Sequence, residues 1–285
     1  MPDFINLPPF DFSKSPFIVI WETTRACALA CVHCRADAIP RRSPNELNND
    51  EAYRLIDEVA ALSTPPPLFV LTGGDPMRRP DLVEVVRYAR ESGLIVALTP
   101  SGTAAVTRSR LMQLKEAGLS RIAVSLDGPD AETHDAFRRV RGSYAWTMKI
   151  VETAIDLGLP LQINTTISRL TLPYLRAMAN HVAQFPLSLW AVFFLVQTGR
   201  GATLDQISAD ECERVLNFLY DLSLSVPFGI KTTEAPQFHR VIWQREHGKA
   251  VGERRPRRAA GITPSGGTDA PRREFRTAGI SRHAN

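Results

Sequence analysis

The amino-acid sequence predicts an α/β protein of six βα units, whose parallel strands curve into a partial or complete barrel. Short β-branched runs alternate with amphipathic stretches over most of the chain, and right-handed connections between such units give a parallel sheet. The residues that are unusual for their surroundings follow the predicted strands, where α/β proteins place their chemistry. The end of the chain departs from this pattern because it is rich in arginine and has no apolar periodicity, which predicts a disordered basic tail.

Six apolar runs are predicted as the strands of this sheet. They cover residues 17–22, 68–72, 94–99, 121–126, 161–167 and 190–196. The longest apolar run of the chain, residues 189–196, is far too short to cross a bilayer and fits a buried strand instead. No membrane association is therefore expected.

The stretches between these runs have the apolar spacing of helices. Asn49 is expected to cap the first helix, and Asp81, with Glu84, resembles a capping box at the start of the second. Cys212 shares a helical face with apolar residues and is expected to pack in the core. The remaining helices are predicted at about residues 107–118, in a stretch ending at residue 158, and around residues 175–182.

Three of the four cysteines, Cys27, Cys31 and Cys34, form a CxxxCxxC cluster directly after the first predicted strand. Thiolates at this spacing can hold a soft metal centre. A closed zinc site needs a fourth ligand, for which His33 is awkwardly placed, and a disulfide framework is typical of small secreted chains. An iron–sulfur cubane on three thiolates would keep one iron open to a small molecule. The spacing by itself leaves zinc and the cubane open.

Glycine and polar residues follow or interrupt the later strands. Each has an ordinary structural explanation, because Gly-Gly-Asp-Pro forms a turn and satisfied polar residues are common at strand ends. Their convergence on one edge of a parallel sheet is what predicts a shared site. The residues are Gly73, Gly74, Asp75, Pro76, Ser101, Ser125, Asp127, Asn164 and Gln197.

The formal net charge of +4 is unevenly distributed along the chain. Ten Lys or Arg and four Asp or Glu give residues 241–285 a net charge of +6. We expect an N-terminal extension at 1–16, the barrel at 17–240 and a basic tail at 241–285. A solvated tail is favoured over a nucleic-acid contact. The sequence begins without a secretory segment and carries exposed thiols, so a reducing cytoplasm is expected.

Taken together, these motifs resemble the radical S-adenosylmethionine (radical SAM) superfamily over roughly residues 17–233. The three cysteines are similar to its signature, and residues 71–76, LTGGDP, are similar to the motif that grips the methionine amino group. Residues 23–36, 125–128 and 134–138 are similar to the branch with peptide-modifying and haem-biosynthesis enzymes, which usually carry a cysteine-rich SPASM domain. The resemblance implies a parallel (βα)6 partial barrel of TIM type.

The same resemblance implies two cofactors, a [4Fe-4S] cluster on Cys27, Cys31 and Cys34 and S-adenosyl-L-methionine. Electron transfer into the bound sulfonium would release methionine and a 5′-deoxyadenosyl radical, which would abstract hydrogen from a peptide or tetrapyrrole-like substrate. An oxidoreductase of this kind implies a reductant such as flavodoxin or ferredoxin.

Individual roles in binding S-adenosylmethionine follow from the resemblance. Gly73 and Gly74 would let the backbone approach the methionine, and Asp75 would accept a hydrogen bond from its ammonium group, although the family more often has Glu there. Arg138 is either a carboxylate partner or part of a solvated helix face. The further implied ligands are Pro76, Ser101, Ser125, Asp127 and Asn164, with His33 near the adenine.

The carboxyl-terminal part departs from that branch. No cysteine follows Cys212, so the cysteine-rich domain is expected to be absent, truncated or replaced beyond about residue 243. Two alternatives to an active enzyme follow. One is a catalytically silent protein that retains the cluster, and the other is a zinc-binding interaction module with a nucleic-acid-binding tail.

Overall fold

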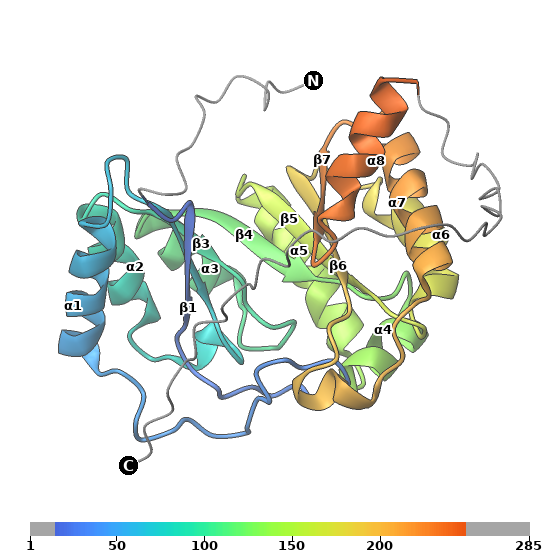
Figure 1. The fold of residues 1–285 in the computed structure, drawn as a ribbon. Coiled ribbons are helices and arrows are strands. Elements are labelled where there is room, and N and C mark those ends of the chain that lie inside the picture. Colours follow the sequence, from blue (N-terminus) through green and yellow to red (C-terminus); the bar gives the residue numbers. More distant parts are fainter. Residues whose placement is uncertain (1–14, 249–285) are drawn as a thin grey trace, which may run out of the picture.

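The structure, a computed structural model, describes residues 15–248 and centres on one parallel sheet of seven strands in sequential order (Figure 1). The outer strands do not pair with each other in the described part of the chain, so the sheet is a curved, open half-barrel. This confirms the predicted partial parallel barrel. The strands are β1 (Ile18–Glu22), β2 (Leu68–Thr72), β3 (Ile95–Leu98), β4 (Leu119–Ser125), β5 (Leu161–Ile167), β6 (Leu189–Phe194) and β7 (Gly229–Thr233).

Helices connect successive strands and cover the outer face of the sheet (Figure 1). Short 3-10 turns, labelled η, precede or follow several of them. The helices are α1 (Asn49–Ala60), α2 (Leu82–Glu91), α3 (Arg108–Glu116), α4 (Ala131–Arg138), α5 (Ser143–Asp156), α6 (Leu175–Val182), α7 (Ala209–Ser223) and α8 (Gln237–Glu246). The 3-10 turns are η2 (Pro76–Arg78), η3 (Leu172–Tyr174) and η4 (Gly199–Thr203).

Two predicted helix caps differ from those observed. The N-cap of α1 is Asn48, one residue before the predicted Asn49, and it forms a reciprocal capping box with Glu51. Asp81 occupies the N-cap position of α2 as predicted, but it forms no capping box, because its carboxylate accepts a hydrogen bond from buried Arg79 at 2.7 Å instead. Both helices nevertheless bury the predicted apolar faces.

The carboxyl-terminal part of the described chain holds two elements that the sequence did not predict. Strand β7 extends the sheet beyond β6, and α8 follows it. Because α8 spans residues 237–246, the ordered unit extends past the boundary predicted at residue 240. Most of the predicted disordered tail lies outside the described residues.

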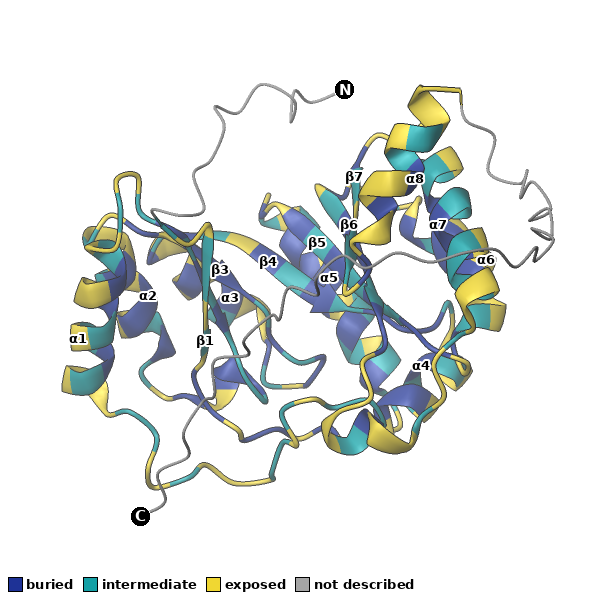
Figure 2. Ribbon diagram, in the orientation of Figure 1, coloured by how far each residue is buried: buried dark blue, intermediate teal, exposed yellow. Residues whose placement is uncertain are grey.

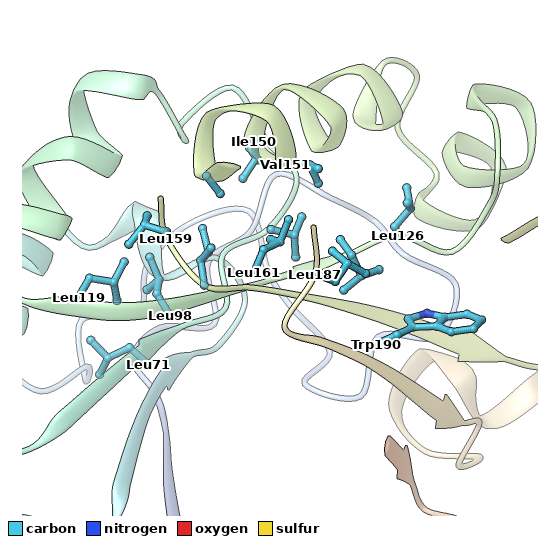
Figure 3. Packing of buried hydrophobic residues seen from close by; sticks show 14 of the residues in the cluster. Leu71, Leu98, Leu119, Leu126, Ile150, Val151, Leu159, Leu161, Leu187 and Trp190 are labelled. Carbon is cyan, nitrogen blue, oxygen red and sulfur yellow. The ribbon is translucent and has the colours of Figure 1, made fainter. Parts of the chain in front are cut away.

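The main core lies between the sheet and its helices. Leu161 of β5 lies next to Ile150 and Val151 of α5, while Leu98 of β3 and Trp190 of β6 extend the same apolar cluster to either side along the sheet (Figure 3). The helices turn their buried residues inward and their exposed residues outward (Figure 2). Cys212 of α7 is half-buried and packs against this core, as its helical spacing predicts. The core thus fixes the strands whose carboxyl ends carry the candidate site.

None of the helices in the described part of the chain combines the length and apolar character needed to cross a bilayer.

Candidate functional site

The cysteine loop, which we define as residues 23–39, follows β1 and crosses the carboxyl ends of the strands (Figure 1). Its beginning is tied to β2, because the Thr23 N–H donates to the carbonyl of Thr72 at 2.8 Å. Its middle is tied to α4 through the N–H groups of Ala30 and Val32, which donate to the carbonyls of Arg138 and Phe137. The loop is therefore held by two elements distant from it in sequence.

The three thiols of this loop are free and lie in one small apolar cluster, separate from the main core. Cys27 and Cys31 are buried and Cys34 is half-buried. Burial raises the pKa of the Cys27 thiol, so the loop without metal keeps this sulfur protonated and metal binding would displace the proton.

Each of the three sulfur atoms has a hydrogen-bond donor directed at it. The Leu29 N–H donates to Cys27 Sγ at 3.3 Å, Arg138 Nη1 to Cys31 Sγ at 3.5 Å, and the Ala38 N–H to Cys34 Sγ at 3.5 Å. Cys27 Sγ also lies 3.3 Å from the hydroxyl of Ser101. Donors to sulfur stabilise bound thiolates and tune an iron–sulfur centre.

Three thiols on one loop, each with a donor to its sulfur, supply the ligand chemistry that an iron–sulfur cluster requires. Among the described residues, no group of three or more His, Cys, Asp or Glu side chains is placed to hold one metal ion. A mononuclear zinc site takes four ligands on one ion, whereas a four-iron cluster takes each thiolate on a different iron. Buried polar atoms without a partner also gather here, namely His33 Nδ1, Arg138 Nε and Arg200 Nη2.

The Gly73-Gly74 turn after β2 lies against the backbone of the cysteine loop. The Gly74 N–H donates to Thr24 O and the Asp75 N–H to Ala26 O, both at 2.7 Å. A Cβ at Gly74 would lie 2.6 Å from the carbonyl oxygens of Arg25 and Ala26, and Gly73 has a φ of +138°. These glycines are thus required for the turn to approach the cysteine loop itself.

Asp75 is completely buried at the start of η2. Its carboxylate accepts from the N–H groups of Met77 and Ser101 at 3.2 and 3.3 Å and from the Thr103 hydroxyl at 2.9 Å. Burial raises its pKa because these neutral donors only partly offset the loss of water. Since the Ser101 hydroxyl donates to Gly74 O at 2.7 Å, Asp75 and Ser101 join the loops after β2 and β3.

Asp127, which follows β4, forms an ion pair with Arg138 at the end of α4. The Thr166 N–H donates to the other carboxylate oxygen of Asp127 at 2.7 Å. Burial by itself would raise the pKa of Asp127, but the guanidinium of Arg138 lowers it below its ordinary value. The interpretation of Arg138 as part of a solvated helix face is wrong, because Arg138 is buried while Arg139 and Arg141 are exposed.

Ser125 and Asn164 are register partners on β4 and β5 and are both half-buried. Asn164 Oδ1 accepts from Gln162 at 2.6 Å on the same strand. His33 stacks on Phe137 with ring centroids 4.4 Å apart, and burial lowers its pKa to about 4. Neutral His33 therefore packs against α4 in the described fold.

The sequence analysis did not single out Arg200 in η4. Its N–H donates to Cys34 O, its Nε to Cys31 O and its Nη1 to Ala38 O, each at 3.0 Å. Flanking glycines allow this approach, since a Cβ at Gly199 would lie 2.5 Å from Cys34 O. The sequence signal for this contact was an arginine between two glycines after the sixth predicted strand. Gln197 does not join the site, because its side chain donates to Leu204 O.

The family model described as "Radical SAM superfamily" matches residues 21–180. The chain is 41% identical over 237 residues to an "AdoMet-dependent heme synthase" of Oleidesulfovibrio alaskensis, covering 82% of this chain and 60% of that protein. It is 32% identical over 218 residues to an "Fe-coproporphyrin III synthase" of Methanosarcina barkeri, covering 76% of this chain and 53% of that protein.

A more distant relative is a "PqqA peptide cyclase" of Rhodopseudomonas palustris, 34% identical over 154 residues, which are 54% of this chain and 40% of that protein. The chain spans between 60% and 66% of the length of the three haem synthases that it matches. Among solved structures, Streptococcus suis SuiB bound to S-adenosylmethionine superposes with a TM-score of 0.66 at 13% identity, over 79% of this chain and 52% of SuiB. That similarity concerns the fold.

Proposed function

Because this chain belongs to the radical SAM superfamily, we propose that it holds a [4Fe-4S] cluster on Cys27, Cys31 and Cys34 and reductively cleaves S-adenosylmethionine. The observation that carries the proposal is the arrangement of three free thiols in one loop, each with its own donor directed at sulfur. The chemistry supplied by such a bound cluster is one-electron reduction of a sulfonium, which yields methionine and a 5′-deoxyadenosyl radical.

The protein residues divide into two groups under this proposal. Ser125 is the last residue of β4, and its register partner Asn164 lies in the middle of β5; both are half-buried, so we assign them direct contacts with the nucleoside. The second group, which includes Asp75 and Arg138, is already engaged in contacts within the protein, and we assign it the task of holding the loops around the ligand. Its members are Gly73, Gly74, Asp75, Pro76, Ser101, Asp127 and Arg138.

For the substrate we propose a tetrapyrrole. The support is the similarity to the haem synthases and to the Fe-coproporphyrin III synthase, which extends over more of this chain than the similarity to the peptide cyclase. A peptide is the second candidate, and the similarity to the peptide cyclase is what favours it. For the electron source we propose a flavodoxin or ferredoxin, because the reaction requires single electrons at low potential.

The test is anaerobic reconstitution of the chain with iron and sulfide, followed by dithionite and S-adenosylmethionine. We expect a bound cluster and formation of 5′-deoxyadenosine. Cys31→Ala should lose both, and Cys212→Ala is the matched control that should keep both, because Cys212 lies on α7 outside the loop. A cluster without cleavage would indicate a catalytically silent protein, and bound zinc without a cluster would overturn the proposal.

A second measurement addresses the substrate. Iron coproporphyrin III is incubated with the reconstituted protein, and both porphyrin mass and 5′-deoxyadenosine are followed. A substrate-dependent rise in 5′-deoxyadenosine with a change in porphyrin mass supports the tetrapyrrole. Formation of 5′-deoxyadenosine that the porphyrin neither accelerates nor consumes would contradict it.

A further inference from the structure

One of the three candidate cluster ligands, Cys31, has a cationic side chain as its donor. Arg138 Nη1 lies 3.5 Å from Cys31 Sγ, whereas the donors to Cys27 and Cys34 include the uncharged backbone N–H groups of Leu29 and Ala38. The three thiols are therefore electrostatically unequal.

The charge on Arg138 is held in place by its surroundings. The guanidinium is nine-tenths buried and pairs through Nη2 with the fully buried carboxylate of Asp127. A guanidinium stays protonated in proteins, and its ion pair with Asp127 supplies the matching carboxylate. The cation therefore lies against the sulfur of Cys31, with the anion on its other side.

A buried charge next to a redox centre acts strongly because little water screens it. Reduction of a cluster adds one negative charge, which a nearby cation stabilises and a nearby anion destabilises. Hydrogen bonds to cluster sulfurs and local net charge are both determinants of the reduction potential of iron–sulfur centres.

We propose that the Arg138–Asp127 pair sets the reduction potential of the cluster through Cys31, with Arg138 raising the potential and Asp127 limiting the rise. The inference rests on the proposed function, because it requires a cluster on Cys31. Arg138 is a positioning residue in this scheme, since it acts on the cluster through a ligand. The second arginine of the site, Arg200, binds backbone carbonyls of the loop, and among the described residues its side chain has no hydrogen bond to a sulfur.

The experiment is a potentiometric titration of the reconstituted protein without S-adenosylmethionine, followed by electron paramagnetic resonance of the reduced cluster. Arg138→Gln should lower the reduced-to-oxidised ratio at a fixed potential at least tenfold, which corresponds to about 59 mV for a one-electron couple. Asp127→Asn should shift the ratio in the opposite direction, because it leaves the guanidinium uncompensated. Arg138→Lys keeps the positive charge, so its reduced-to-oxidised ratio should lie between those of Arg138→Gln and the unmodified chain.

Arg139→Gln is the matched control, since it removes an exposed positive charge from the next residue and should leave the ratio unchanged. Opposite shifts for Arg138→Gln and Asp127→Asn cannot come from a general loosening of the site. Should Arg138→Gln fail to retain iron and sulfide, Asp127→Asn and the double variant decide the question. Unchanged potentials in variants with full clusters would overturn the inference and leave the proposed function intact. Absence of a cluster from the unmodified chain would instead overturn the proposed function.

Discussion

Two buried aspartates at the carboxyl ends of the strands, Asp75 and Asp127, have opposite electrostatic situations. Asp75 is surrounded by neutral donors and its pKa is raised, whereas Asp127 has a guanidinium partner and its pKa is lowered. Both lie within three residues of the end of a strand, Asp75 after β2 and Asp127 after β4. The difference teaches that burial by itself does not fix the charge of a carboxylate, because the partner decides whether the loss of water is compensated.

The largest effect expected from this comparison is on stability. Asp127→Asn leaves Arg138 as a buried charge without its counterion and should lower the free energy of unfolding by about 3–5 kcal/mol. Asp75→Asn keeps an oxygen for the two N–H donors, and the Thr103 hydroxyl can turn to accept from the new amide. Its cost should stay below about 1 kcal/mol. Urea unfolding of both variants measures the difference, and equal losses would contradict the comparison.

The second effect concerns the loop that Asp75 supports. Gly74→Ala places a methyl group 2.6 Å from two carbonyl oxygens of the cysteine loop, and such overpacking costs about 1–3 kcal/mol. We expect it also to reduce iron retained per chain after reconstitution. Gly93→Ala is the control, because a Cβ at Gly93 meets nothing within 4 Å and only its φ of +88° is strained. Normal iron content in Gly74→Ala would show that the cysteine loop binds iron without the support of this turn.

The pH dependence of stability provides a third, weaker test. The contribution of Asp127 is present above the unfolded pKa of about 3.9 and is lost as the pH falls through its lower folded pKa. Asp75 has the opposite sign, because stability is lost as the pH rises from about 3.9 through its raised folded pKa. Urea unfolding at several pH values between acid and neutral should therefore show that the free energy of unfolding of Asp75→Asn increases, relative to that of the unmodified chain, as the pH rises. A constant difference would show that Asp75 has an ordinary pKa.

The smallest expected effect on stability comes from an exposed ion pair, which serves as the reference for the buried pair of Asp127 and Arg138. Arg108 and Asp156 are 3.0 Å apart, with 57% and 63% of their side chains exposed. Arg108→Gln should change the free energy of unfolding by about 1 kcal/mol or less, because water and salt screen the pair. Thermal unfolding at low and high salt measures this change. A loss as large as that for Asp127→Asn would contradict the role assigned to burial.

The fold was predictable where strands are buried on one face by helices. Those strands are rich in apolar and β-branched residues, and in residues 161–167 every second side chain is buried. Strand β7 was missed because its sequence, GIKTT, contains a single large apolar side chain, Ile230. Helix α8 follows it and begins without a capping side chain. The other edge strand, β1, was predicted because its sequence, IVIWE, is largely apolar although no residue of it is fully buried. Local patterns thus indicate strands that carry an apolar run and fail for β7, which has none.

At the site, the grouping of the cysteines with Gly73, Gly74, Asp75 and Ser101 followed from strand order, because parallel strands end on the same side. The pairing of Asp127 with Arg138 could not be predicted, since it depends on the angle at which α4 returns to the sheet. The contact of Arg200 with the cysteine loop is similarly a property of tertiary structure. For such contacts a sequence supplies only residue types, as in the glycines on either side of Arg200.

The contact between Arg200 and Cys31 joins residues 169 positions apart in the chain. A ribosome that has synthesised only the first strands exposes the cysteines without the residues that hold their backbone. The loop cannot complete its described hydrogen bonds until η4 has left the exit tunnel. The loop consequently reaches its described conformation late in translation or in the released polypeptide, after most of the sheet has been made.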